Sequence, residues 1–222
     1  DVYKRQDLRD FSYRTIVIDD TMRADHAALI QDKLLNSNRL FTASTIGSLR
    51  IQKDATEQDI LRINAHQADI AMRKAWDIIK PGLTEENIAL AIQNSFSDQG
   101  ALPQFSIVAS GSNSAFPHHK TGSRKLKEGD AIVIDLGGKF EGYASDITRM
   151  SSIGAPPKDY ALIHQIVEDA VCAAMAAARP GQIAKNVDRA AREVIERAGF
   201  GKYFVHRTGH GLGSEIHEPP FI

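Results

Sequence analysis

Apolar and polar positions along the chain predict helices and strands in mixed order. The segment from Thr56 to about residue 80 carries apolar side chains at helical spacing, and Thr56 and Asp59 resemble a capping box at its start. A Pro-Gly pair follows this segment, as expected at the end of a helix. Thr84 is expected to cap a second helix that runs to about Gly100.

Two further helices are predicted over 157–178 and 184–199, and short strands over 104–109 and 203–206. The later helices repeat the helix-ending residues of the earlier pair at one fixed offset. Four coincidences at one offset suggest two structurally equivalent α/β halves that face each other across a cleft. A chance recurrence of helix-ending residues is the alternative. The matching pairs, each 99 residues apart, are Pro81 and Pro180, Gly82 and Gly181, Gly100 and Gly199, and His118 and His217.

The segment 131–149, AIVIDLGGKFEGYASDITR, reads as a β-hairpin with a Gly-containing turn. A turn centred on Phe140 and Glu141 would place Asp135 directly opposite Asp146, with Cβ atoms about 4.5–5.5 Å apart. Like charges at that distance repel, so this pairing is costly unless a cation lies between them. On the hairpin alone, the alternative is that one Asp belongs to a turn and the other is a surface charge.

The first 45 residues are expected to be the remnant of an N-terminal α/β domain plus a linker. Residues 15–19, 22–35 and 39–43 predict a β-α-β unit that is too small to bury a core of its own. Residues 1–10 are charged and aperiodic, and we expect them to be frayed or foreign to the domain. The main domain is then expected to span 46–222.

Composition narrows the classes of partner. The net charge of −1 is spread without long runs and gives no reason to expect nucleic acid or an anionic membrane. No segment reaches the roughly 18 apolar residues of a membrane span, and no signal peptide is seen. The single cysteine, Cys172, excludes an internal disulfide and favours a reducing compartment, so a cytoplasmic location is expected. Its apolar neighbours, VCAAMAAA, predict a buried structural thiol.

The C-terminal segment gathers three histidines among glycines. His206, His210 and His217 fall within twelve residues, interleaved with Gly209, Gly211 and Gly213. A lone histidine is more often structural, but three in a glycine-rich segment beside an acidic hairpin favour a ligand site. The GHGLG sequence is not a phosphate-binding loop, because the two prolines of the following EIHEPP block the helix that such a loop needs.

Two aspartates and one histidine would form an oxygen and nitrogen site that suits Mn, Co, Zn or Fe. Bridging carboxylates favour two ions about 3.5–4 Å apart that share a water and lower its pKa. Such a site hydrolyses amides or esters, and nearby imidazoles steady the tetrahedral intermediate. His118 and His217 are the candidates for that role, and a structural core histidine is the alternative for each.

These motifs resemble a known family. Asp135 in VIDLGG, Asp146 in YASDITR, His210 in HRTGHGLG and His217 in EIHEPP are similar to the pita-bread metallopeptidases, most of all to the Xaa-Pro branch of prolidase and aminopeptidase P. The resemblance covers roughly residues 46–222. It implies an α+β fold with an internal pseudo-two-fold repeat, in which Asp135 and Asp146 are shared ligands of a dinuclear centre and His210 is a terminal ligand.

The resemblance also implies an activity. His118 and His217 match the histidines that contact the substrate and the intermediate, and His206 matches a further substrate-binding position. The implied reaction is hydrolysis of the peptide bond before a penultimate proline in a short peptide, by water activated by two divalent ions. Manganese is favoured, with Co, Zn or Fe as alternatives. The full-length parent is expected to be a homodimer, and both dipeptidase and aminopeptidase activity are compatible with the motifs.

The sequence departs from the family pattern in one respect. The family completes its metal site with two glutamates after the EIHEPP segment, and the sequence stops before them. Glu215 and Glu218 are too close to His217 to replace them. We therefore expect a C-terminally truncated chain that binds metal weakly and has little activity, while the parent protein is a peptidase.

Two other functions are compatible with the same fold. A non-catalytic binding module would have no need for Asp135, Asp146 and His210 together, so their presence argues against it. A metal-free hydrolase related to creatinase would not need two opposed carboxylates. Replacement of Asp146 with Asn in the parent separates the peptidase from the binding module, because a peptidase should lose its activity and a binding module should hardly change.

Overall fold

The computed structural model describes residues 13–222, so the segment 1–10 that was expected to be frayed lies outside the described residues. The chain forms two compact units, Asp1–Lys53 and Asp54–Ile222. The boundary expected at 45/46 lies just before a short helix, α2 (Gly47–Ile51), which belongs to the first unit. No helix within residues 13–222 combines the length and the apolar composition that a membrane span requires.

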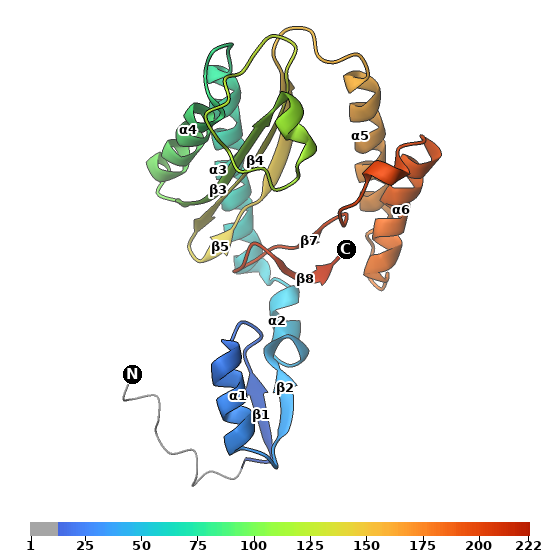
Figure 1. Cartoon of the computed structure of the whole chain (residues 1–222). Coiled ribbons are helices and arrows are strands. Elements are labelled where there is room, and N and C mark those ends of the chain that lie inside the picture. Colours follow the sequence, from blue (N-terminus) through green and yellow to red (C-terminus); the bar gives the residue numbers. More distant parts are fainter. Residues whose placement is uncertain (1–12) are drawn as a thin grey trace. The chain divides into compact units, whose positions relative to one another are not determined.

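The first unit contains the predicted β-α-β arrangement (Figure 1). Strands β1 and β2 are parallel and are joined by a helix, as a crossover connection requires. Ile18 and Leu34 are its only buried apolar residues within 13–53, which agrees with the small core expected from the sequence. Its elements are β1 (Thr15–Ile18), α1 (Ala24–Lys33), β2 (Asn38–Phe41), the 3₁₀ helix η3 (Thr42–Ser44) and α2.

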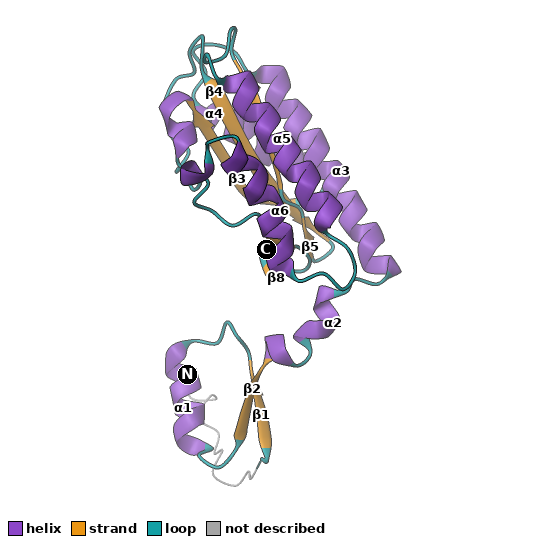
Figure 2. Ribbon diagram, turned by 90° about the vertical axis from the view of Figure 1, so that its right-hand side faces the viewer, coloured by secondary structure: helices purple, strands orange, loops and turns teal. Residues whose placement is uncertain are grey.

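The second unit begins with two helices that pack on an antiparallel sheet (Figures 1 and 2). In the sheet, β4 lies between β3 and β6, and β5 continues the hairpin next to β4. Alternate residues of β4, from Ile132 to Leu136, contact the helices and form the main core with Met72, Ile92 and Phe96. The elements are α3 (Ala55–Ile78), α4 (Glu85–Asp98), β3 (Leu102–Ser110), η4 (Gly111–Ala115), β4 (Ala131–Phe140), β5 (Tyr143–Ala144) and β6 (Ile147–Ser152).

Side chains cap both helices at their N-termini. In α4 the predicted cap is confirmed, since Thr84 Oγ1 accepts a hydrogen bond of 3.2 Å from the Asn87 amide. In α3 the capping box predicted at Thr56 and Asp59 was wrong, because the observed capping box lies two residues earlier, at Asp54 and Glu57. Asp54 is the N-cap, and its carboxylate accepts from the Glu57 amide at 2.9 Å while the Glu57 carboxylate accepts from the Asp54 amide at 2.7 Å.

A second helix pair, α5 (Tyr160–Ala177) and α6 (Ala184–Arg197), confirms the repeat. Helix α6 begins and ends 99 residues after α4. The glycines that follow the helices also match in conformation, because their positive φ angles suit a residue without Cβ. These angles are 89° at Gly82 and 83° at Gly181, and 73° at Gly100 and 85° at Gly199.

Two expectations for the second half were wrong. The strand expected over 203–206 does not form; instead η5 (Gly201–Tyr203) leads into an irregular segment, because no strand within 13–222 pairs with it. Cys172 is exposed rather than buried. Helix α5 packs on α6 through Ala170 and Ala174, and a residue midway between these two points to the opposite side of the helix.

The sheet closes tightly around Gly137 of β4, and we expect Gly137→Ala to destabilise the chain by about 2–3 kcal/mol. A Cβ at this position would overlap the Ser145 carbonyl oxygen and the Phe105 ring. Urea unfolding of the two variants would measure the difference, with Gly122→Ala as the control because its nearest neighbour would be Lys120 O at 3.8 Å. Equal midpoints for both variants would contradict the predicted overlap.

Candidate metal centre

The hairpin register differs from the one predicted. The two-residue turn is formed by Glu141 and Gly142, with φ angles of 50° and 84°. This turn pairs Asp135 with Thr148 and not with Asp146. The predicted register was therefore wrong by two residues, because a turn with two positive φ angles is centred one residue later than the turn that was assumed.

Asp135 lies on the face of the sheet opposite the helices. Its neighbours Ile134 and Leu136 are buried against α3 and α4, and side chains alternate along a strand. The Thr148 hydroxyl donates a hydrogen bond of 2.7 Å to Asp135 Oδ1. Thr148 was missed in the sequence, and the correct turn position was the information that would have found it.

Asp146 reaches the same region by another route. It lies between β5 and β6, where Ser145 interrupts the regular ladder: the Ser145 amide donates to Gly138 O at 2.8 Å and its hydroxyl accepts from the Gly138 amide at 3.1 Å. Burial raises the pKa of Asp146, and the nearby Asp135 carboxylate raises it further. The pKa of Asp135 is raised as well, mainly by burial. The two carboxylates therefore interact although they are not opposed in the ladder.

The histidine-rich segment lies beside this hairpin. The Ala144 amide donates to Gly213 O at 2.8 Å, and Lys139 Nζ donates to Ser214 O at 2.8 Å. A short strand pair, β7 (His210–Gly211) and β8 (Glu218–Phe221), closes the segment. These contacts bring His210 Nε2 to 3.4 Å from Asp146 Oδ2.

The orientation of His210 leaves one ring nitrogen available as a ligand. Its Nδ1 lies 2.9 Å from Gly211 O, and a carbonyl oxygen can only accept, so Nδ1 donates. In the neutral ring Nε2 then carries a lone pair that points toward the Asp146 carboxylate. A lone pair facing a carboxylate is unfavourable unless a cation or a proton lies between them.

Two of the remaining candidate histidines, His118 and His217, lie near Asp135, and the third, His206, lies beside His118. The His217 ring centroid is 4.3 Å from that of His210, and the His118 centroid is 5.7 Å from that of His206. His118, His210 and His217 each lower the pKa of Asp135 electrostatically. Burial lowers the pKa of His217, and its electrostatic interactions with His210, Arg207 and His118 lower it further. The structure thus brings His118, His210 and His217 near Asp135, with Asp146 next to His210 and His206 next to His118.

A divalent cation fits this donor set in its chemistry. Within residues 13–222 no three His, Cys, Asp or Glu side chains are grouped closely enough to hold one ion as they stand. However, two half-buried carboxylates with raised pKa values and an imidazole lone pair directed at one of them are oxygen and nitrogen donors that a cation would stabilise. Asp135, Asp146 and His210 are the residues that would hold it.

A second set of contacts, missed in the sequence, fixes the path of the histidine-rich segment. Arg192 on α6 pairs with Asp188 at 2.9 Å and donates to Phe204 O at 2.9 Å and to His206 O at 3.1 Å. The Thr208 hydroxyl donates to Asp188 at 2.8 Å. The spacing of Asp188 and Arg192 indicates an ion pair on a helix, but no sequence pattern shows that the pair also binds the backbone next to His206.

Comparison with known proteins identifies the family of the chain. The model of metallopeptidase family M24 matches residues 59–222. The chain is 40% identical over 207 residues to a "probable dipeptidase PepE" of Mycobacterium bovis, covering 92% of this chain and 55% of the relative. It is 41% identical over 179 residues to a "Xaa-Pro dipeptidase" of Pyrococcus furiosus, covering 80% and 51%. The chain thus spans about half the length of these curated relatives.

The likeness extends to three dimensions. The crystal structure of dipeptidase PepE from Mycobacterium ulcerans matches with a TM-score of 0.89 and 39% identity, over 93% of this chain and 56% of that one. The prolidase of Pyrococcus furiosus matches with a TM-score of 0.87 and 36% identity, over 95% and 63%. The pita-bread fold expected from the motifs is therefore confirmed. With its sequence match and its fold in agreement, the chain belongs to metallopeptidase family M24.

Proposed function

We propose that the protein to which this chain belongs is a metal-dependent exopeptidase that hydrolyses the bond before a penultimate proline in short peptides. The observation that carries the proposal is the approach of His210 Nε2 to 3.4 Å from Asp146, on the same face of the sheet as Asp135. The names of two similar proteins, Xaa-Pro dipeptidase and prolidase, support the substrate class.

In this proposal Asp135, Asp146 and His210 hold the divalent metal. The metal, when bound, supplies a Lewis acid for the peptide carbonyl and lowers the pKa of water. Two ions, with manganese first and Co, Zn or Fe as alternatives, remain the prediction from the sequence. A homodimeric assembly and a cytoplasmic location also remain predictions from the sequence.

The histidines around the carboxylates would act on the substrate. The lowered pKa of His217 keeps its ring neutral near pH 7. A neutral imidazole can donate a hydrogen bond to a carbonyl oxygen that gains negative charge, which is the role we propose for it. His118 and His206, with ring centroids 5.7 Å apart, would contact the substrate from a neighbouring position.

The test is hydrolysis of matched Xaa-Pro and Xaa-Ala dipeptides with and without Mn²⁺, measured by the release of the free amino acid. We expect Xaa-Pro cleavage that is lost on chelation and restored by Mn²⁺. The 222-residue chain and, where the reading frame continues, its longer product are assayed side by side. Cleavage that persists after chelation would favour a metal-free hydrolase, and metal binding without any cleavage would favour a binding module.

A further inference from the structure

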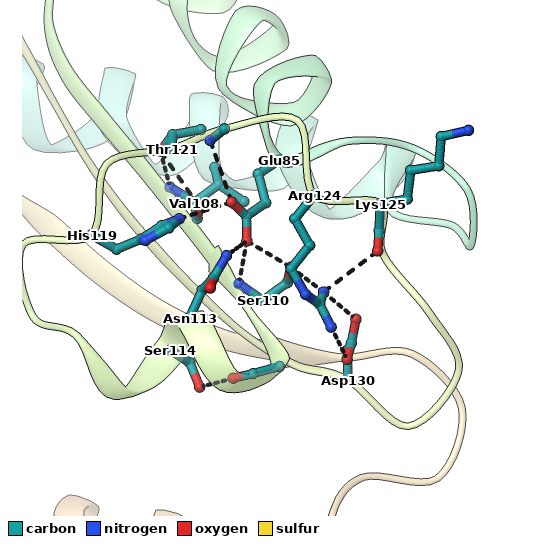
Figure 3. A network of polar contacts seen from close by, with 12 residues as sticks. Glu85, Val108, Ser110, Asn113, Ser114, His119, Thr121, Arg124, Lys125 and Asp130 are labelled. Carbon is teal, nitrogen blue, oxygen red and sulfur yellow. Dashed lines mark hydrogen bonds and ion pairs between the residues drawn. The ribbon is translucent and has the colours of Figure 1, made fainter.

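A buried carboxylate at the start of α4 accepts hydrogen bonds from the end of β3 and from the segment that connects β3 to β4 (Figure 3). Glu85 is fully buried, with 0% of its surface exposed. Its Oε1 accepts hydrogen bonds from the Ser110 amide at 2.8 Å, the Ser110 hydroxyl at 2.7 Å and Asn113 Nδ2 at 3.0 Å. Its Oε2 accepts from His119 Nε2 at 2.8 Å and from the Gly122 amide at 3.3 Å.

An ion pair holds the far end of the same segment, residues 111–130, which we call the β3–β4 loop. Arg124 binds Asp130 through two hydrogen bonds of 2.6 and 2.8 Å, and the Lys127 amide donates to Asp130 at 2.9 Å. Arg124 also donates to the Ser110 hydroxyl, whose own hydrogen goes to Glu85. The Ser110 hydroxyl therefore links the ion pair to the buried carboxylate.

His118 depends on this network for its position. Within residues 13–222 its ring has no hydrogen-bond partner, and its described contact is the edge-to-face approach to His206. The next residue, His119, is bound to Glu85 through its ring nitrogen. The backbone that carries His118 is therefore fixed one residue away, by the carboxylate of Glu85.

The chemistry of the five donors requires a carboxylate. Three backbone or amide N–H groups, one hydroxyl and one ring N–H converge on Glu85, and an ionised carboxylate is the side chain that only accepts. A glutamine at this position would place its NH₂ group against at least two of these donors, where no hydrogen bond can form. The adjacent Glu86 is exposed, so a favourable charge in the first helical turn is already present without burial.

We propose that Glu85 is a positioning residue, which holds the β3–β4 loop so that His118 faces Asp135 and His206. The expected effect of Glu85 on kcat rests on the proposed function. Its effect on the order of the β3–β4 loop does not depend on that function. Glu85 touches neither the proposed metal ligands nor the substrate side of the site, so it acts through His118.

A double-mutant cycle on kcat tests the catalytic part. Glu85→Gln should lower kcat about 10–100-fold, because a displacement near 1 Å of a catalytic group has effects of this size. In a His118→Ala background the same substitution should have no further effect. The control, Glu86→Gln, removes a negative charge from the same helical turn and should change kcat less than about two-fold. An equal loss with and without His118 would overturn the proposal.

Hydrogen exchange of the amides in the β3–β4 loop tests the positioning part independently of activity. Glu85→Gln should accelerate exchange over residues 111–122, while Glu86→Gln leaves it unchanged. If Glu85→Gln does not fold, His119→Ala, which removes the contact with Oε2, takes its place in both measurements. Absence of peptide cleavage by the full-length protein would refute the proposed function, and faster exchange in the loop would still support the positioning role. Unchanged exchange would refute that role.

Discussion

In the full-length protein, Asp146→Asn should reduce the proposed metal-dependent peptidase activity about 1,000-fold or more, the largest effect expected of any single substitution. Asn keeps the size of the side chain but removes the negative charge that faces His210 Nε2 and Asp135. A loss of about 4 kcal/mol of transition-state stabilisation corresponds to this factor. The measurement is kcat/KM for an Xaa-Pro dipeptide at saturating Mn²⁺.

The matched control is Asp98→Asn, an exposed aspartate at the end of α4. It makes the same change of charge away from the proposed site and should leave kcat/KM within about two-fold of the wild type. Activity of Asp146→Asn at the level of this control would show that the carboxylate at 146 has no part in catalysis.

His217→Ala should lower kcat about 100-fold while the affinity for metal stays nearly unchanged. The loss of one donor to a developing oxyanion has effects of about 10²–10³-fold, and the lowered pKa of His217 keeps its ring in the neutral, donating form. Kinetics at saturating Mn²⁺, with the metal affinity measured separately, distinguish this role from that of a ligand. His66→Ala, on the exposed side of α3, is the control. Loss of metal affinity without loss of kcat at saturating metal would contradict the assignment.

The helices could be predicted from the sequence because their determinants are local. Apolar spacing, the Thr84 cap and the glycines after each helix predict α4 and α6 to within a few residues, and the offset of 99 residues between them is present in the sequence itself. The three candidate ligands, Asp135, Asp146 and His210, could also be predicted, because each lies in a short sequence motif.

The register of the β4–β6 hairpin and the burial of residues on α5 could not be predicted without the tertiary structure. The predicted hairpin register was wrong by two residues because the turn was centred on Phe140 and Glu141, whereas Glu141 and Gly142 form it, both with positive φ angles. The apolar run around Cys172 suggested burial, yet burial on α5 depends on which side contacts α6. A pattern of apolar residues indicates the element but not the surface that will cover it.

Glu85 and Arg192, which hold the segments that carry the histidines, could not be predicted from the sequence for a different reason. Glu85 and Glu86 are equivalent in the sequence, and only the packed structure shows that the first is buried with five donors while the second faces solvent. The same holds for Arg192, whose bonds to two backbone carbonyls become visible only when the histidine-rich segment is in place.

The central claim is that the side chains at 135, 146 and 210 bind one divalent metal centre, and Mn²⁺ titration followed by electron paramagnetic resonance tests it most directly. The titration compares the unmodified chain with Asp135→Asn, Asp146→Asn, His210→Ala and the control Asp98→Asn. Each of the first three substitutions should weaken Mn²⁺ binding at least about ten-fold, equivalent to about 1.4 kcal/mol, and the control should not. Unchanged Mn²⁺ affinity in all three variants would contradict the account.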